Sequence, residues 1–201
     1  MRLVADTNVL FTFFWKNSVL KEIMHQGVKL FAPEYSLEEI NRHKQEIIDK
    51  AKITENEFTG QLYLMEHEVD FVPKSAYEKQ IAEIERISRI FSEPEKSEIM
   101  EDADFLALAI LLHCPLWSND TLLKKQGKVN VLSTHDVILI VEPTAPTQFS
   151  WDKMLDRIKE QDKHFKGKRE KIDHDLIAHG VSRDGTTLED LKKRKGKKRK
   201  K

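Results

Sequence analysis

Cysteine is nearly absent from this chain: Cys114 is the single one among 201 residues. One cysteine excludes an intramolecular disulfide and a zinc site built from several thiolates. The longest apolar runs, such as residues 105–112, are far shorter than the ~20 residues that a membrane-spanning helix needs. Asp6 interrupts the first apolar segment before a signal peptide can form. We therefore expect a protein of a reducing compartment, located in the cytoplasm, with no membrane contact.

Glycine is also scarce, with seven residues scattered along the chain. None of them forms a GxGxxG loop after the first apolar segment, which argues against a glycine-rich phosphate-binding loop. Histidines such as His164, His174 and His179 lack cysteine partners, so we interpret them as solvated residues and not as a zinc site. Carboxylates remain as the residues that carry chemistry.

The formal net charge of zero hides an uneven distribution of charge. Residues 191–201 hold nine of the 34 basic residues and no acidic one, so the preceding 190 residues have 25 basic and 34 acidic residues, a formal charge of −9. This basic tail is either a solvated end that aids solubility or an arm that binds a polyanion. We favour the arm, because an acidic body repels polyanions; its basic residues are Lys192, Lys193, Arg194, Lys195, Lys197, Lys198, Arg199, Lys200 and Lys201.

Short apolar segments alternate with segments of helical periodicity, which predicts an α/β fold: three α/β/α layers around a central parallel sheet. The predicted strands are residues 2–5, 29–32, 69–72, 115–118 and 128–132. The predicted helices are residues 18–26, 34–49, a helix opened by the capping box Thr54–Glu57, and residues 76–91, 102–113, 120–125 and 134–141. Residues 93–101 are expected to be a polar connection.

The chain divides near two prolines, Pro143 and Pro146. We expect a domain over residues 1–142 and a C-terminal extension over residues 143–201. The extension is predicted to hold an amphipathic helix at about residues 150–160 and the basic tail 191–201, and to be otherwise mostly extended or disordered.

Four acidic residues stand where predicted strands and helices meet. Asp6 follows the first strand, Asp120 follows the strand at 115–118, Asp102 opens the most apolar helix, and Glu39 lies in the second helix. In open parallel sheets the ligand crevice lies outside the carboxyl ends of the strands, so Asp6 and Asp120 are expected at one edge. Carboxylate oxygens there suit a hard cation, Mg²⁺ or Mn²⁺.

Each of these acids has another interpretation. Asp102 and Asp120 stand at helix starts, where Asp is a preferred N-cap. Glu39 lies on a charged helix beside Glu38, and either side chain could be simply solvated. Asp104 could be an outer ligand or a solvated residue favoured by the dipole of its helix.

Taken together, the motifs VADTN (Asp6, Thr7, Asn8), LEEI (Glu39), DADFLALA (Asp102) and WSND (Ser118, Asp120) resemble the pattern of PIN-domain nucleases. That family has a strand ending in Asp-Thr/Ser-Asn/Ser, a helical Glu, an Asp that opens an Ala-rich helix, and a strand ending in Thr/Ser-x-Asp. The resemblance covers roughly residues 1–142. It favours Glu39 over Glu38, because the family glutamate is usually followed by an apolar residue.

The resemblance implies a metal-dependent ribonuclease. Its catalytic residues would be Asp6, Glu39, Asp102 and Asp120; Asp6, Asp102 and Asp120 would hold Mg²⁺ or Mn²⁺, supported by Thr7, Asn8, Asp104, Ser118 and Asn119. The basic tail would then bind RNA. A catalytically silent RNA- or protein-binding module is the alternative. The family also suggests a homodimer, and an antitoxin partner if the protein is a toxin, although the extension and tail depart from compact toxins and leave an RNA-processing role open.

Overall fold

The structure is a computed structural model that describes residues 1–141. The predictions for the extension at 143–201, its amphipathic helix at about 150–160 and the basic tail 191–201 therefore lie outside the described residues.

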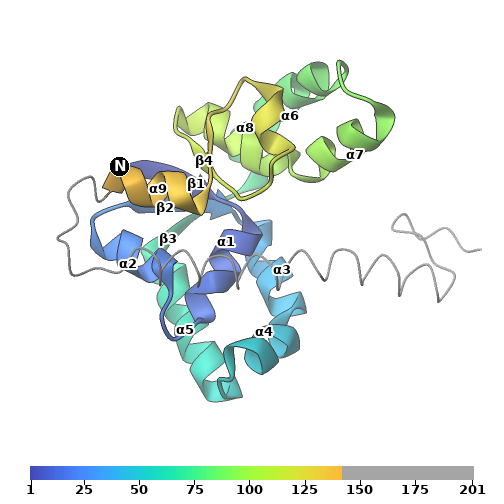
Figure 1. Ribbon diagram of the computed structural model, residues 1–201. Coiled ribbons are helices and arrows are strands. Elements are labelled where there is room, and N and C mark those ends of the chain that lie inside the picture. The colour runs from blue at the N-terminus through green and yellow to red at the C-terminus, as the bar shows by residue number, and fades with distance from the viewer. Residues whose placement is uncertain (142–201) are drawn as a thin grey trace, which may run out of the picture. The chain divides into compact units, whose positions relative to one another are not determined.

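A five-stranded sheet forms the centre of the described part, in the order β3-β2-β1-β4-β5. Every neighbouring pair of strands is parallel, which confirms the predicted parallel sheet. The sheet order places the first strand in the middle (Figure 1), and because all pairs are parallel the five carboxyl ends lie at one edge. The strands are β1 (Arg2–Ala5), β2 (Lys29–Pro33), β3 (Val69–Val72), β4 (Leu116–Trp117) and β5 (Val131–Leu132).

Helices cover both faces of this sheet and complete the predicted three-layer architecture. In Figure 1, α6, α7 and α8 lie on one side of the sheet, and α1, α4 and α5 lie on the other. The helices are α1 (Thr7–Phe11), α2 (Val19–His25), α3 (Tyr35–Arg42), α4 (Lys44–Ala51), α5 (Glu55–Glu68), α6 (Lys74–Ser88), α7 (Glu93–Glu101), α8 (Ala103–Leu112) and α9 (Thr134–Val141), with 3₁₀ turns η1 (Thr12–Phe14) and η2 (Leu123–Gln126).

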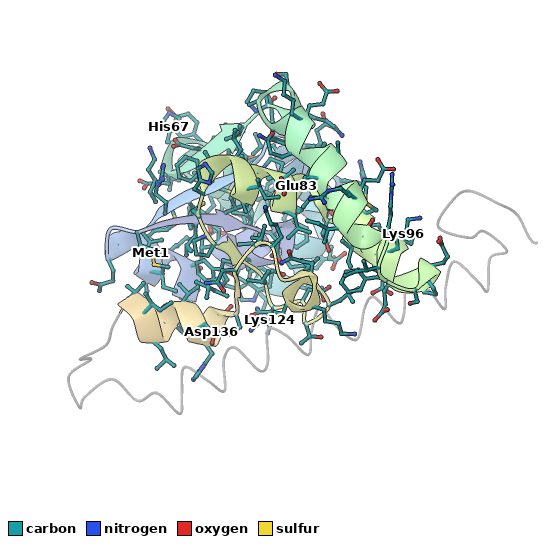
Figure 2. The ribbon with its side chains drawn as sticks, turned by 90° about the horizontal axis from the view of Figure 1, so that it is seen from above. Met1, His67, Glu83, Lys96, Lys124 and Asp136 are labelled. Carbon is teal, nitrogen blue, oxygen red and sulfur yellow. The ribbon has the colours of Figure 1, made fainter. Side chains whose placement is uncertain are left out.

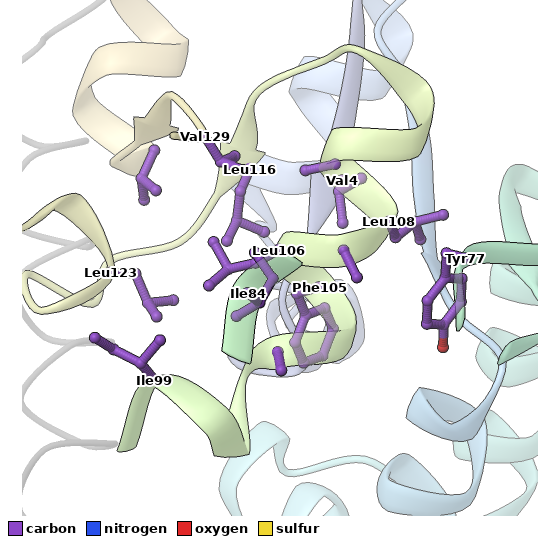
Figure 3. Close-up of a cluster of buried hydrophobic side chains, with 14 of the residues drawn as sticks. Val4, Tyr77, Ile84, Ile99, Phe105, Leu106, Leu108, Leu116, Leu123 and Val129 are labelled. Atoms are coloured by element: carbon purple, nitrogen blue, oxygen red, sulfur yellow. The ribbon is translucent and has the colours of Figure 1, made fainter. Parts of the chain in front are cut away.

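The core has two halves because β1 buries both of its faces. Leu3 and Val4 are adjacent, point to opposite faces, and are both fully buried, as expected for a doubly covered parallel strand. Val4 belongs to the cluster that the sheet makes with α6 and α8 (Figure 3). Elsewhere in the core the rings of Phe14 and Phe58 stack with centroids 4.7 Å apart. The apolar packing thus fixes β1, and with it the residue that follows β1.

The predicted capping box is confirmed, and a glycine ends another helix. The Thr54 hydroxyl accepts from the Glu57 N–H and the Glu57 carboxylate accepts from the Thr54 N–H, which is the predicted capping box of α5. Gly27 follows α2 with a φ of +82°, a conformation that a residue with a Cβ rarely adopts.

The single helix predicted over residues 34–49 is wrong, because the chain forms α3 and α4 with His43 between them. His43 has φ −92° and ψ 11°, outside the helical region, and its ring packs edge-on against Phe11 at 5.6 Å. The break turns α4 away from the axis of α3. Apolar periodicity shows no break at this point, and the ring that His43 contacts belongs to a distant segment.

The polar connection predicted over residues 93–101 is also wrong, because those residues form α7. Glu95 accepts hydrogen bonds from the Ser92 hydroxyl at 2.8 Å and from the Ser92 N–H at 3.4 Å, and Pro94 stands in the first turn. Ile99 is fully buried and attaches this polar helix to the core. A capping box and one buried apolar residue are enough to form a helix here, although the apolar periodicity is too weak to predict one.

The elements predicted around β4 and β5 are longer than those observed. The strand predicted over 115–118 narrows to β4, and the helix predicted over 120–125 is replaced by a turn at Asp120 followed by η2. The strand predicted over 128–132 is limited to β5. The Gln126 side chain binds the backbone of Lys128 and Val129, so these groups are not available to a strand ladder.

Candidate metal and nucleic-acid site

Asp6 stands directly after β1, at the carboxyl edge of the sheet. The register pairs Ala5 with Trp117, so Asp6 and Ser118 come next on the two neighbouring strands. The Asp6 N–H donates to the Trp117 carbonyl at 3.1 Å. Asp6 is only 6% exposed, and its Oδ1 accepts a hydrogen bond from the Val9 N–H at 2.7 Å. Asp6 is therefore both the acid at the end of the central strand and the N-cap of α1.

Glu39 is brought to the same edge by Thr7. The buried Thr7 hydroxyl donates to Glu39 Oε2 at 2.7 Å, which joins α1 to α3. Glu39 is half-buried, whereas Glu38 is exposed, so the structure distinguishes these two neighbouring acids in the way the resemblance favours. Asn8, predicted as a supporting residue, has an exposed side chain.

The turn after β4 holds Ser118, Asn119 and Asp120. The fully buried Ser118 hydroxyl accepts from the Asp120 N–H at 3.1 Å, and Asp120 Oδ1 accepts from the Leu122 N–H at 2.7 Å. Asn119 instead exchanges two hydrogen bonds with Thr134, at 2.9 Å and 3.0 Å. Asn119 thus fastens the start of α9, while Ser118 shapes the turn that carries Asp120.

Asp102 and Asp104 stand at the junction of α7 and α8. Asp102 occupies the N-cap position of α8 but makes no side-chain capping hydrogen bond there, so the N-cap interpretation of its carboxylate is wrong. Asp104 lies in the first turn of α8, with a side chain 20% exposed. Its Oδ1 lies 3.5 Å from the Lys74 Nζ at the start of α6.

Tyr35 connects these acids electrostatically. Burial is the largest cause that raises the pKa of its hydroxyl well above the ordinary value, and the charge of Glu39 is the next. The charges of Asp104 and then Asp102 raise this pKa further. Tyr35 therefore stays protonated and can donate a hydrogen bond to a carboxylate or a ligand. The ring of Tyr35 also packs edge-on against Phe105 with centroids 5.7 Å apart, so α3 and α8 are in contact here.

Tyr77 of α6 lies at the inner side of this region. Burial raises the pKa of its hydroxyl, and the nearby charge of Asp104 is the second cause. The Tyr77 hydroxyl and Asp104 Oδ1 are both shielded from solvent, and neither makes a well-formed hydrogen bond within residues 1–141.

Sequence reasoning missed Tyr35, Tyr77 and Lys74. A signal existed for two of them: Tyr35 and Lys74 each stand two or three residues after a predicted strand, and Tyr35 precedes Glu39 by one helical turn. The carboxyl-edge argument applies to them as it does to Asp6. Tyr77 carries no comparable signal, because its place depends on how α6 packs against α8.

The donor set fits a divalent cation in chemical type, since carboxylates are the hard oxygen ligands that Mg²⁺ and Mn²⁺ prefer. Among residues 1–141, however, no three His, Cys, Asp or Glu side chains form a group that could hold a metal ion. The donors share one edge of the sheet, and a metal would require their side chains to turn toward a common point.

A family model described as the PIN domain matches residues 4–140 of the chain. The chain belongs to the PIN-domain family. PIN domains are generally metal-dependent nucleases, and the match includes all four predicted acids. No curated protein matches the chain significantly. In this PIN domain the four predicted acids stand after β1, within α3, before α8 and after β4.

Proposed function

We propose that this PIN domain is a ribonuclease that hydrolyses RNA phosphodiester bonds with Mg²⁺ or Mn²⁺. The observation that carries the proposal is the hydrogen bond from Thr7 to Glu39, which brings the acid of α3 to the strand edge where Asp6 stands. Two strands of the sheet thereby present acids at the place where parallel sheets bind ligands. The membership of a nuclease family supports the same chemistry.

Asp6, Asp102 and Asp120 are the residues that would hold the ion, with Glu39 completing the site directly or through water. A divalent cation supplies positive charge on the scissile phosphate and lowers the pKa of a bound water. The chain itself provides the framework: the Val9 N–H fixes the rotation of the Asp6 carboxylate, and the Leu122 N–H fixes that of Asp120. Thr7 in turn orients the Glu39 carboxylate.

The experiment is a titration of the full chain with Mn²⁺, followed by a cleavage assay on single-stranded RNA with Mg²⁺, Mn²⁺ or a chelator. Asp6→Asn serves as the matched variant, because an amide oxygen can still accept from Val9. We expect saturable Mn²⁺ binding and metal-dependent cleavage, with cleavage lost in Asp6→Asn. Equal cleavage in the presence of chelator, or full activity of the folded Asp6→Asn protein, would contradict the proposal.

One observation favours a second function, an RNA- or protein-binding module without catalysis. Asp6 and Asp120 each use one carboxylate oxygen to bind backbone N–H groups, and the described acids do not form a three-residue metal group. A silent module would bind RNA with the same affinity in Mn²⁺ and in chelator and would release no shortened product. The same assay therefore separates the two functions.

RNA is the proposed partner of both functions. The acidic body, with a formal charge of −9, repels an RNA strand, and residues 191–201 offer nine cations that attract it. We propose that the basic tail binds RNA phosphates without regard to sequence.

The other predicted partners remain predictions. An antitoxin protein, a homodimer and a cytoplasmic location follow from the resemblance or the composition alone. Among the helices of residues 1–141, none is long and apolar enough to cross a membrane.

A further inference from the structure

Lys74 is a cation on an edge of the sheet that otherwise presents carboxylates. It begins α6, two residues after the end of β3, and the Val72 carbonyl of β3 accepts from the Glu34 N–H at the end of β2. Since all strands are parallel, Lys74 shares the carboxyl edge with Asp6 and the start of α3. Its side chain is 63% exposed, so the ammonium faces solvent at that edge.

Lys74 and Asp104 form an ion pair and not a hydrogen bond. The N–H donors of the Lys74 ammonium group therefore stay available to another acceptor. Lys74 Nζ lies 3.5 Å from Asp104 Oδ1, and within residues 1–141 this oxygen has no hydrogen bond. The Asp104 side chain is 20% exposed and its Oδ1 is shielded, whereas the Lys74 side chain is largely exposed. A mostly buried anion thus lies beside a largely exposed cation, which keeps N–H donors for another acceptor.

Tyr77 lies at the inner side of Asp104. Lys74 and Tyr77 are one helical turn apart on α6, and the Tyr77 side chain is fully buried beside α8, with Val4 and Leu108 in the same core cluster (Figure 3). Its hydroxyl lies next to Asp104 and has no well-formed hydrogen bond in the described part of the chain. The Tyr77 phenol therefore covers the inner side of the Asp104 carboxylate, and the side that faces Lys74 stays open.

We propose that Lys74 binds a phosphate of the RNA strand beside the one that is cleaved, and that Asp104 positions Lys74 for this contact. The proposal rests on the ribonuclease function and adds the residue that holds the neighbouring part of the substrate. Adjacent strands lie ~4.8 Å apart, so the end of β3 lies about 10 Å from the end of β1. Lys74 begins α6 two residues beyond that end of β3, so we assign it to the neighbouring phosphate of the RNA, where it would contribute equally to substrate and transition-state binding.

The test measures kcat, KM and metal-free affinity for Lys74→Met, with Lys79→Met as control, an exposed lysine of the same helix. A fluorescein-labelled single-stranded RNA in chelator reports affinity without cleavage. For Lys74→Met we expect KM and the dissociation constant to rise about tenfold at low salt with kcat nearly unchanged, and the salt slope of binding to fall by about 0.7. Lys74→Arg should restore most of the affinity, and Lys79→Met should resemble the wild type.

Asp104→Asn tests whether Asp104 positions Lys74. If Asp104 acted only by repelling RNA, removal of its negative charge would make RNA binding tighter. We expect weaker binding from Asp104→Asn when Lys74 is present, and tighter binding when Lys74→Met is already in place. Tighter binding in both backgrounds would overturn the role of Asp104. Tyr77→Phe keeps the packing and should leave the fold intact.

The outcomes separate this inference from the ribonuclease proposal. A wild type that cleaves RNA while Lys74→Met keeps its KM and affinity would overturn the inference and leave the nuclease intact. A lower kcat with unchanged KM would also overturn it, because Lys74 would then act at the reacting phosphate. If the wild type does not cleave, the affinity measured in chelator still decides whether Lys74 binds phosphate.

Discussion

Thr7 Oγ1 lies 2.7 Å from Glu39 Oε2, although 32 positions separate the two residues in the chain. Thr7 follows Asp6 directly, so this hydrogen bond fixes Glu39 relative to the acid of the central strand. It crosses from α1 to α3, and both helices begin at the carboxyl ends of adjacent parallel strands. The contact is the best-defined link between two of the candidate catalytic acids.

Removal of the Thr7 hydroxyl should weaken both the fold and the site. Thr7→Val keeps the shape of the side chain and leaves Glu39 without this donor, so we expect the free energy of unfolding to fall by about 1 kcal/mol. The cleavage rate should fall as well, because Glu39 is no longer oriented. Urea unfolding and RNA cleavage measure the two effects, and Thr7→Ser should retain both. A normal rate in Thr7→Val would show that the contact is structural only.

The neighbours Glu38 and Glu39 give a matched pair of variants. Glu39→Gln should reduce cleavage strongly, since it removes a half-buried carboxylate at the site, whereas Glu38→Gln changes an exposed side chain and should leave the rate unchanged. The same single-stranded RNA assay measures both. A larger effect from Glu38→Gln would place the family glutamate at the other position.

Asp6 is both the N-cap of α1 and a proposed metal ligand, and two variants separate these roles. Asp6→Asn should abolish cleavage and leave stability close to that of the wild type, because its side-chain oxygen still accepts from the Val9 N–H. Asp6→Ala removes the cap too and should lower the free energy of unfolding by about 1 kcal/mol. Thermal or urea unfolding beside the cleavage assay distinguishes them. Equal stability of the two variants would mean that the cap contributes little.

Removal of residues 191–201 should weaken RNA binding mainly at low salt. A chain without these cations releases fewer counterions from the RNA, so the slope of log affinity against log salt should become shallower by ~0.7 for each phosphate that is no longer bound. Binding isotherms at several salt concentrations measure this slope. An unchanged affinity at low salt would show that the tail does not bind RNA.

Asp136 should make stability depend on acid pH. Hydrogen bonds from the Ser133 hydroxyl and then the Ser133 N–H lower the pKa of Asp136 to about 2, and Lys124 Nζ, 3.1 Å away, contributes less (Figure 2). A depressed carboxylate pKa stabilises the fold above the ordinary value of 3.8, and this stabilisation is lost as pH falls toward 2.

The matched variant is Asp136→Asn. It should be less stable than the wild type at pH 6, and the difference should shrink between about pH 4 and pH 2. Urea unfolding across this range measures it. A constant difference between the two proteins at all pH values would contradict the role of the ionised carboxylate.

Much of the fold could be predicted because its signals are local. The apolar segments at 2–5 and 69–72 form β1 and β3, and the Thr54 capping box opens α5 as expected. A capping pair or a strand-length apolar run needs no information from distant residues. A shared edge for Asp6 and Asp120 could likewise be predicted, because the carboxyl-edge rule for parallel sheets applies to any α/β chain, whereas Glu39 and Asp102 were singled out by the family resemblance.

Other features had no local cause. The break at His43 accompanies a ring contact with Phe11. The position of Tyr77 beside Asp104 depends on the packing of α6 against α8. These contacts join side chains that are far apart in the sequence, so no local pattern predicts them.

The sequence by itself determined the parallel α/β architecture and the acids at its junctions, because strand length, apolar periodicity and capping act within a few residues. Only the tertiary structure decided which neighbours those acids meet: Thr7 for Glu39, a backbone N–H for Asp6 and for Asp120, and Lys74 for Asp104. Such pairings depend on the crossing of helices over the sheet, where the burial of apolar side chains sets the distances between polar ones.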